Sequence, residues 1–464
     1  MKRRTFSLLA GTSMLALTGA KKNAFAQSAS DFATLSTTTL TPFGSERAGN
    51  AAGTIPAWTG GFTTVPADWK IGSEMVPDFW ADERPLYTVD ASNMAQYASV
   101  LTDGVKQLIQ KQGFSLQVYP THRTQASPQW VYDNIVKNST SAKLNEPDGR
   151  TGFTGAFGGV PFPVPDTSNP LSAGAQVIWN HRCRWMGTAN TEIGCSMVSN
   201  GGQIVLAGAG KTENSFPFYD PNGSVATYQG YVYRNHEVLF GPGTFVGEQI
   251  TDQFATNSLQ NPDILWELLP GQGRVRKAPE LKYDTPSGFT DGIANFDEYY
   301  CFDGALDRYD WKLLGKQEML VPYNNNKLRR TPVDVAHLPK FVNPDAVRWE
   351  LHRVWVVDAT LHPGERHVVP HRRFFVDEDT WTITLADEWD ANGDLEKCGM
   401  NYNIAFPNLP GTILLNTVLY NLQTGDYVTI SGPWGNSPYN APISFAPIPP
   451  SDLEPQAMAA AASY

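Results

Sequence analysis

Once its first 26 residues are set aside, the chain lacks any hydrophobic run long enough to cross a membrane. No later apolar stretch reaches the ~18–20 residues that a spanning helix needs, so the mature chain is expected to be soluble. Positive charge is also scarce, with 35 Lys and Arg against 46 Asp and Glu and a formal net charge of −11. Such a chain is repelled by nucleic-acid phosphates and by anionic membrane surfaces, which argues against either as a partner.

Cysteine is scarce as well, with Cys183, Cys195, Cys301 and Cys398 as the whole set. None of them forms a C-x-x-C pair, which argues against a structural zinc site. In an oxidising compartment an even count permits two disulfides, and the separation of Cys183 from Cys195 suits a hairpin. The alternative is four buried free thiols.

The N-terminus has the composition of a secretory signal peptide covering residues 1–26. A basic head at residues 2–4 precedes an apolar run from Phe6 to Ala20, and Ala24–Ala26 supplies a small-x-small cleavage pattern. The paired arginines in the head and Lys21-Lys22 before the cleavage site favour the twin-arginine route, with the general secretory route as the alternative. Removing this segment takes away five basic residues and brings the net charge to about −16. We therefore expect an exported protein of the periplasm.

Strand patterns dominate the mature chain. The full sequence contains 40 glycines and 34 prolines, and 12% of its residues are aromatic, which favours a β-rich body with many turns. Alternating apolar and polar residues predict strands at 177–187 and 348–361. Strand and turn signals alternate through 372–400 as in an antiparallel meander, and 416–432 reads as a hairpin that turns at Thr424-Gly425.

Helix patterns are few and early. Apolar residues spaced three and four apart from Met94 to Leu108 predict one amphipathic helix that ends near Gly113. Ser127 and Pro128 predict the start of a second short helix, over 127–139. Residues 451–464 carry no core pattern and are expected to form a flexible tail. We find no internal repeat and predict one domain over 27–450.

Three stretches begin like functional motifs and then fail. The segment 206–212, LAGAGKT, resembles the end of a phosphate-binding loop, but Val205 replaces the required glycine, so a glycine-rich turn is predicted. The segment 236–240, HEVLF, has Phe240 where a zinc-protease helix needs its second histidine. The segment 390–396, DANGDLE, lacks the glycine and the final glutamate of a calcium loop and fits a hairpin turn better.

One histidine cluster remains as a candidate for metal binding or proton transfer. His362, His367 and His371 surround Glu365 in HPGERHVVPHRR. Histidines beside a Pro-Gly turn are more often solvated, so we predict neither a metal site nor catalytic residues here. No cofactor is expected.

Aromatic side chains are the clearer signal, because they gather on the predicted strands. Rings on a curved sheet either fill a core or enclose an apolar ligand, and core filling is the more frequent case. The predicted ligand-binding residues are Trp179, Trp185, Trp349, Trp355, Phe374 and Trp381.

Three long stretches together resemble one bacterial envelope family. They are LTPFGSERAGNAAGTIPAWTGG, DTPSGFTDGIANFDEYYCFDGALDRYDWKLLGKQEMLVPYNNNKLR and RWELHRVWVVDATLHPGERHVVPHRRFFVDEDTWTITLADEWDANGDL. The chain resembles the family catalogued as domain of unknown function 1329, described as similar to outer-membrane lipoprotein-sorting proteins, over roughly residues 38–440. Its N-terminal motif contributes Glu46, Arg47, Asn50 and Trp58 within a segment, 38–62, that would act as a strap along a sheet edge or as a lid over a ligand.

The resemblance implies a mainly β fold with a few helices: a half-open antiparallel β-barrel covered by helices, like that of the periplasmic lipoprotein carrier. It also implies a lipid or other hydrophobic ligand, an inner-membrane exporter of the resistance-nodulation-division type and an outer-membrane partner protein. The resulting hypothesis is a periplasmic carrier. A non-catalytic structural or interaction protein of the envelope and a periplasmic enzyme acting on a hydrophobic substrate are the alternatives.

Overall fold

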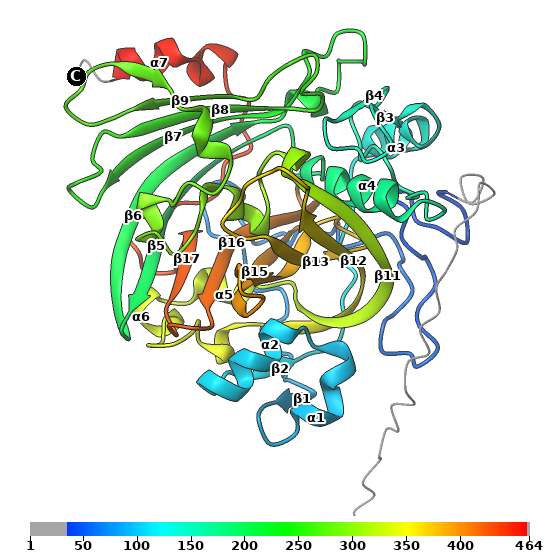
Figure 1. The fold of residues 1–464 in the computed structure, drawn as a ribbon. Coiled ribbons are helices and arrows are strands. Elements are labelled where there is room, and N and C mark those ends of the chain that lie inside the picture. The colour runs from blue at the N-terminus through cyan, green and yellow to red at the C-terminus, as the bar shows by residue number, and fades with distance from the viewer. Residues whose placement is uncertain (1–34, 462–464) are drawn as a thin grey trace, which may run out of the picture.

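The structure, a computed structural model, describes residues 35–461, so the predicted signal peptide lies outside the described residues. One 15-stranded sheet dominates it (Figure 1), with strand order β1-β2-β12-β13-β14-β15-β16-β17-β5-β6-β7-β8-β9-β10 and β11 paired to β12. Its strands are β1 Tyr87–Val89, β2 Leu116–Val118, β5 Ala189–Asn200, β6 Gln203–Ser215, β7 Tyr231–Gly241, β8 Gln249–Ala255, β9 Ile264–Leu268, β10 Val275–Lys277, β11 Tyr309–Pro322, β12 Trp349–Leu361, β13 His371–Asp377, β14 Ile383–Trp389, β15 Leu395–Phe406, β16 Gly411–Asn421 and β17 Tyr427–Gly432. A separate ribbon pairs β3 Lys143–Leu144 with β4 Phe153–Thr154.

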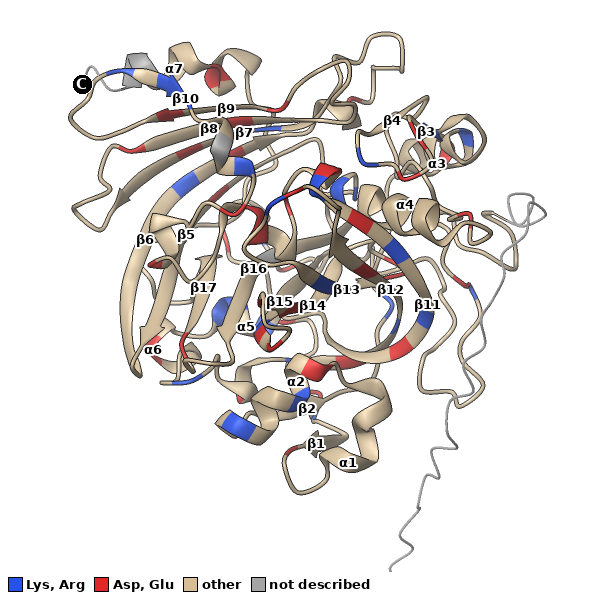
Figure 2. Cartoon of the chain, in the orientation of Figure 1, with Lys and Arg blue, Asp and Glu red and all other residues tan. Residues whose placement is uncertain are grey.

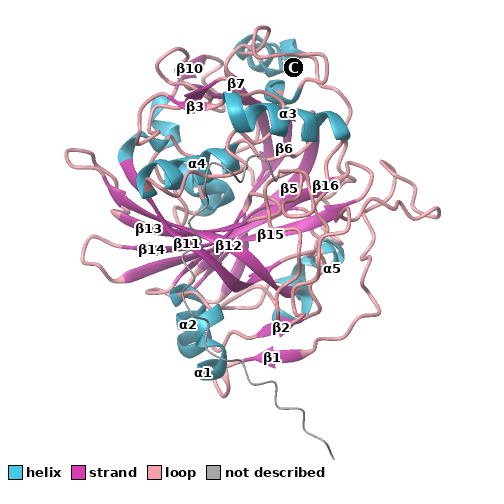
Figure 3. Cartoon of the chain, turned by 90° about the vertical axis from the view of Figure 1, so that its right-hand side faces the viewer, coloured by secondary structure: helices cyan, strands magenta, loops and turns pink. Residues whose placement is uncertain are grey.

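The sheet is antiparallel apart from a single parallel contact between β12 and β2. Its long strands curve strongly, and within the described residues the strands β1 and β10, which end the strand order, do not pair with each other, while β11 forms a further edge beside β12. The α-helices are α1 Met94–Tyr97, α2 Asp103–Gln107, α3 Gln129–Ser141, α4 Pro170–Arg182, α5 Asn326–Arg330, α6 Val333–Ala336 and α7 Pro455–Ala461. Helix α4 packs against β11 and β12, while α1 and α2 lie at the opposite end (Figure 3). The predicted mainly β, half-open fold with helices over the sheet is confirmed.

The C-terminal half follows the sequence pattern closely. The strand predicted at 348–361 is β12, the meander of 372–400 is β13, β14 and the start of β15, and the hairpin of 416–432 is β16 with β17. These strands bury one or both faces under apolar side chains, so alternation and turn residues identify them.

The strand predicted at 177–187 is wrong, because most of this segment belongs to helix α4. The Asn169 side chain caps the helix by accepting hydrogen bonds from the Leu171 and Ser172 amides, and Pro170 occupies the first turn. Nearly every residue from 172 to 182 is buried. A helix that is buried on all sides has apolar residues on every face, so its sequence lacks the 3.6-residue pattern. The alternation of residues within it therefore predicts a strand where the structure has a helix.

Two other local predictions also change. The segment 206–212 is the middle of strand β6 and not a turn, and its glycines leave room for close neighbours, since a Cβ at Gly208 would meet Phe289 at 3.2 Å and one at Gly210 would meet Leu239 at 2.8 Å. The helix predicted from Met94 to Gly113 is broken at extended Leu101, after which the Thr102 side chain caps α2. Its predicted end at Gly113 is confirmed by a left-handed φ of 79°. The second predicted helix is α3.

The flexible tail predicted over 451–464 is instead structured as far as the structure describes it. A 3-10 helix, η10 (Pro450–Leu453), leads into α7, which lies beside β8, β9 and β10. Leu453 and Met458 are fully buried. Two large apolar side chains in an alanine-rich segment are too few to produce a helical pattern in the sequence.

The predicted disulfide between Cys183 and Cys195 is absent, because all four cysteines are buried free thiols. Cys183 ends helix α4, whereas Cys195 lies in β5. The hairpin that would have brought the two together does not exist.

Candidate functional site

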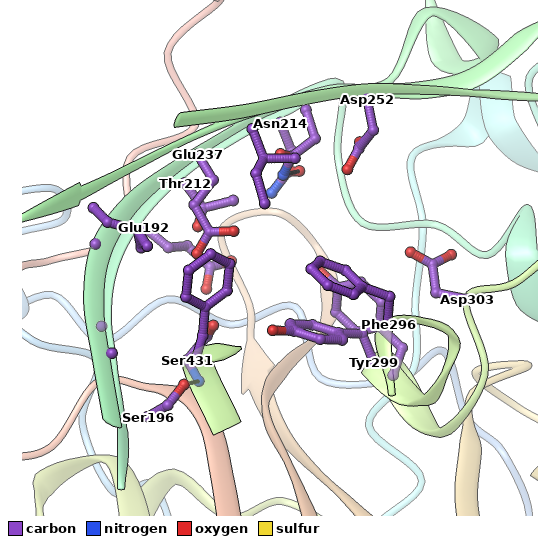
Figure 4. A pocket seen from close by; sticks show the side chains of 18 of the residues that line it. Glu192, Ser196, Thr212, Asn214, Glu237, Asp252, Phe296, Tyr299, Asp303 and Ser431 are labelled. Carbon is purple, nitrogen blue, oxygen red and sulfur yellow. Dashed lines mark hydrogen bonds between the residues drawn. The ribbon is translucent and has the colours of Figure 1, made fainter. Parts of the chain in front are cut away.

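A cavity of about 110 Å³ lies against the concave side of the curved sheet (Figure 4). Strands β5, β6, β7 and β8 form one wall, with Ser431 of β17 at the margin. The other wall is the segment 288–303, which contains two 3-10 elements, η6 (Gly288–Thr290) and η7 (Phe296–Cys301). The site therefore combines a sheet face with a covering segment that follows β10 in the chain.

The sheet wall carries two adjacent rows of polar side chains. In the first row Glu192 of β5 lies opposite Thr212 of β6, which lies opposite Glu237 of β7. The second row runs across the same strands two residues away, through Asn190, Asn214, Asn235 and Asp252. Residues two apart on a strand share a face, so both rows belong to the concave side.

Hydrogen bonds connect the asparagines of the second row in one direction. The Asn235 amide nitrogen donates to Asn214 Oδ1 at 2.9 Å, and that of Asn214 donates to Asn190 Oδ1 at 2.8 Å. Among residues 35–461 the Asp252 carboxyl at the end of the row receives no donor, and its Oδ1 is buried without a hydrogen-bond partner. The row thus ends in an unsatisfied acceptor that points into the cavity.

Aromatic rings supply the opposite wall. Phe296 and Tyr299 stack at 6.1 Å between ring centroids and face the sheet from η7. Phe289 packs edge-on against Phe296 at 6.3 Å, and Tyr300 follows in the same element. Rings and aliphatic side chains with a few polar groups are the usual composition of a small-molecule site.

Buried ion pairs hold the covering segment in place. The Arg372 guanidinium and the His367 imidazole both contact Asp297, each at 2.9 Å, and hold the pKa of this carboxyl well below its usual range. The Lys397 ammonium donates to Glu298 at 2.8 Å. These contacts fasten η7 to β13 and β15 while its rings face the cavity.

Burial raises the pKa of every carboxyl that lines the cavity. The pKa values of Glu192 and Glu237 rise to about 7 and that of Asp303 to about 6, while that of Asp252 rises well above its usual range. Burial disfavours the charged form, and neighbouring carboxyls add to the effect at Glu237 and Asp252. Figure 2 shows acidic positions recurring along the strands around the labels β7 to β9.

The six aromatic residues predicted to bind ligand do not line this cavity. All six are buried. Trp355 stacks on Trp381 at 6.4 Å, and Phe374 belongs to the same core cluster. Trp349 lies in a second core cluster. Their role in ligand binding stays a prediction.

The two tryptophans of the 179–185 region lie apart. Trp179 donates its indole N–H to the Gly149 carbonyl at 2.8 Å within the core. Trp185 packs edge-on against Trp130 and lines a second, more open cleft of about 260 Å³. Of the six predicted residues, Trp185 is therefore the one placed at a described cleft.

The N-terminal motif attaches the segment 38–62 to the sheet. Glu46 forms ion pairs with Lys316 at 3.3 Å and Arg353 at 3.5 Å, which lower the pKa of its carboxyl despite burial. The Arg47 guanidinium lies 4.8 Å from the centre of the Trp58 ring.

Two further contacts of this segment reach other parts of the fold. Asn50 donates to Glu318 at 3.1 Å, and the Trp58 indole donates to the Gln125 carbonyl at 2.9 Å. No residue of 38–62 is among the residues that line the cavity. The segment therefore contacts the sheet away from this cavity, and its role as a strap or as a lid stays a prediction.

The three candidate histidines are separated by their partners. Each pairs with a different aspartate: His362 with Asp310, His367 with Asp297, and His371 with Asp358. Within residues 35–461 no group of three or more His, Cys, Asp or Glu side chains could hold a metal ion. In that range no helix combines the length and hydropathy needed to cross a membrane.

Pattern reading from the sequence missed the residues that line the cavity. Their signal is present in ANTEIG (189–194), GKTEN (210–214) and RNHEV (234–238), where polar residues occupy both faces of strands that are otherwise half-buried. Polar alternation normally marks a solvent face. Only the curvature of the sheet and the covering segment turn one of these faces inward.

Comparison with known proteins identifies the relatives of this chain. The family described as "Protein of unknown function (DUF1329)" matches residues 88–459. The uncharacterized protein PA3922 of Pseudomonas aeruginosa is 33% identical over 441 residues, which is 92% of this chain and 93% of that protein.

Two solved structures are among those that this chain resembles at low similarity. A DUF1329 family protein from Desulfovibrio piger is 14% identical with a TM-score of 0.42, over 62% of this chain and 99% of that one. A putative outer membrane lipoprotein-sorting protein domain from Vibrio parahaemolyticus is 11% identical, also with a TM-score of 0.42, over 62% of this chain and 98% of that one.

Proposed function

The chain belongs to the DUF1329 family, and from this premise we propose that it is a non-catalytic periplasmic carrier of a lipid or another hydrophobic ligand. The observation that carries the proposal is the cavity between the concave sheet and the segment 288–303. It is lined by aromatic and aliphatic side chains and lies inside a curved, half-open sheet.

The physical reason is the cost of exposing an apolar chain to water. Each buried CH₂ contributes about 0.8 kcal/mol, so a ligand placed between a sheet and a ring-bearing segment is held without covalent chemistry. Aliphatic side chains continue these rows on the same wall of the cavity: Ile250 of β8 lies opposite Glu237, Leu265 of β9 lies opposite Asp252, and Leu239 lies two residues beyond Glu237 on β7. This supports a ligand with both a polar and an apolar part.

The periplasmic location rests on the signal-peptide pattern of residues 1–26. Fractionation of cells that express the full chain is expected to recover a shortened product, with a mass that matches cleavage after Ala26, in the periplasmic fraction. Recovery of the uncleaved chain from the cytoplasm would contradict this part of the proposal.

We also propose the partners implied by the family resemblance: an exporter of the resistance-nodulation-division type in the inner membrane and an outer-membrane protein. A carrier needs a donor and an acceptor, which is what such a pair would provide. In-cell crosslinking followed by mass spectrometry tests this, and crosslinks to neither membrane would contradict it while leaving ligand binding unaffected.

Ligand binding itself is tested by filling the cavity. The Thr212 side chain lies in the cavity between Glu192 and Glu237. Thr212→Trp is expected to reduce binding of the neutral fluorescent probe N-phenyl-1-naphthylamine at least ~10-fold, because a bulky side chain leaves no room for the ligand. The matched control is Lys211→Trp, which changes the neighbouring residue on the other face of β6, where the side chain is 38% exposed.

Two results would contradict the carrier proposal. One is equal probe binding by Thr212→Trp and Lys211→Trp with unchanged circular dichroism. The other is the absence of both probe binding by the wild type and any organic compound extracted from protein purified from periplasm. If Thr212→Trp does not fold, the smaller Thr212→Leu replaces it.

A further inference from the structure

The polar wall of the cavity is acidic, and its strand carboxyls have no ion-pair partner among the described residues. Four of its lining residues are Glu or Asp, and no Lys, Arg or His is among the described residues that line it. Glu192, Glu237 and Asp252 form no salt bridge and accept no hydrogen bond within the part of the chain that is described. An anionic headgroup would be repelled here.

The nearest cation lies behind one of these carboxyls and is itself only partly satisfied. Arg182, which is 5% exposed, places Nη2 3.7 Å from Asp303 Oδ1. Its Nε and Nη2 have no hydrogen-bond partner among the described residues. Arg182 thus offsets part of the charge of Asp303 and of Asp252, and Arg329 acts on Glu192, but within the described residues no cation forms an ion pair or a hydrogen bond with the three carboxyls of the sheet wall.

The aromatic wall favours the same kind of partner. Phe296 and Tyr299 of η7 stack side by side and face the sheet, and Tyr300 lines the cavity next to them. A ring face attracts a cation through its quadrupole, most strongly where water is excluded. An ammonium group placed between the carboxyl wall and these rings would be attracted by both walls.

We propose that the cavity selects an amphiphile whose polar group is a protonated amine, with the ammonium between the carboxyls of β5, β7 and β8 and the rings of η7. This rests on the proposed carrier function and specifies its ligand class. The apolar part of the ligand extends along Leu239, Ile250 and Leu265. A neutral hydroxyl would donate to one carboxyl but gain no charge attraction, and a carboxylate would meet repulsion from both walls.

The test compares three amphiphiles of equal chain length. Dodecylamine, dodecanol and dodecanoate each compete with N-phenyl-1-naphthylamine for the wild-type protein at pH 7.5, below their micelle concentrations. Dodecylamine is expected to displace the probe at a concentration at least ~10-fold lower than either of the others, as for a charge-assisted contact in a dry site. The combined change Glu237→Gln and Asp252→Asn is expected to reduce this preference below ~3-fold.

A surface variant separates the cavity from the overall negative charge of the protein. Glu213 lies next to Thr212 on the other face of β6 and pairs with Lys211 at 3.0 Å. Glu213→Gln removes a negative charge outside the cavity and is expected to keep the preference for the amine. An equal loss of preference in Glu213→Gln and in Glu237→Gln alone would mean general charge attraction and would overturn the proposal.

The remaining outcomes distinguish the two proposals. Equal displacement by dodecanol and dodecylamine would overturn the ammonium assignment and leave the carrier function in place. The same conclusion follows if the probe binds and the amine does not displace it. If the probe and all three amphiphiles fail to bind, both the ammonium assignment and the carrier function are wrong.

Discussion

Replacing Glu237 by Gln is expected to stabilise the protein at alkaline pH and to have little effect in acid. Burial, with the neighbouring Glu248 carboxyl, raises the pKa of Glu237 from 4.5 to about 7. Between these values the unfolded chain loses its proton while the folded protein keeps it, so the free energy of unfolding falls as pH rises. Below pH 4.5 the Glu237 carboxyl is protonated in both states and costs no stability. Above pH 7 it is ionised in both states, and the decrease in the free energy of unfolding is complete.

The magnitude follows from the size of the shift. A change of about 2.5 pKa units at 1.36 kcal/mol per unit sets an upper limit of about 3 kcal/mol, and partial access of water through the cavity reduces it to about 1–3 kcal/mol. Glutamine resembles the neutral carboxyl and does not ionise. The free energy of unfolding of Glu237→Gln should therefore exceed that of the wild type by about 1–3 kcal/mol at pH 8.5 and by under ~0.5 kcal/mol at pH 4.5.

Urea unfolding followed by tryptophan fluorescence measures this difference at the two pH values. Glu213→Gln, on the opposite face of β6, is the control and should show no gain at pH 8.5. A difference of the same size at both pH values would show that the gain does not come from ionisation. A loss of stability at pH 8.5 would refute the assignment of Glu237 as a buried, unpaired carboxyl.

Three further changes test the parts of the fold that position the site. Asp379→Asn should lower the free energy of unfolding by about 2–4 kcal/mol at neutral pH, because the buried Arg123 guanidinium loses its bidentate partner at 2.6 and 2.8 Å and keeps only the more distant Glu378 carboxylate at 3.6 Å. The pKa of Asp379 is lowered, so its contribution is present above the ordinary carboxyl pKa and is lost in acid; an unchanged acid midpoint in a pH titration of unfolding would contradict this. Trp58→Ala should cost about 3–5 kcal/mol in urea unfolding if 38–62 is a strap, and a cost under ~1 kcal/mol would favour a loose segment. Asn169→Ala should cost about 1 kcal/mol in the same assay by removing the cap of α4, with Asn169→Asp, which retains a capping oxygen, close to wild type.

How far the sequence predicts this molecule depends on how each element is buried. Strands β12 to β17 have regular alternation and strong turn residues, so local chemistry alone identifies them. Helix α4 is buried on almost every side, and its sequence therefore lacks the polar stripe that separates a helix from a strand. The tail 450–461 depends on Leu453 and Met458, whose burial is set by strands distant in the chain.

The candidate site was harder to predict because it depends on tertiary structure. The six predicted aromatic residues were chosen for their residue type, and in the structure they pack against other core side chains. Tyr233 and Phe254 line the cavity from β7 and β8, but the other rings that line it come from the irregular segment 288–303, where Tyr300 and Cys301 have positive φ values of 55° and 62°. Irregular backbone gives no periodic pattern in the sequence, so no spacing rule could point to it.

The carboxyls of the cavity link stability to ligand binding. An unpaired carboxyl in an enclosed, aromatic-lined space makes folding less favourable once it ionises, and proteins retain such groups mainly where they serve a function. Glu192 and Glu237 lie opposite the same Thr212 on neighbouring strands, so one positive group placed there would offset the cost of both. A ligand that binds only the folded state adds its binding energy to stability, so under the proposed carrier function the empty protein is the less stable form at neutral pH. The proposed ammonium ligand would explain the unpaired carboxyls of β5, β7 and β8, whereas the asparagines of the second row already bond to one another within the sheet.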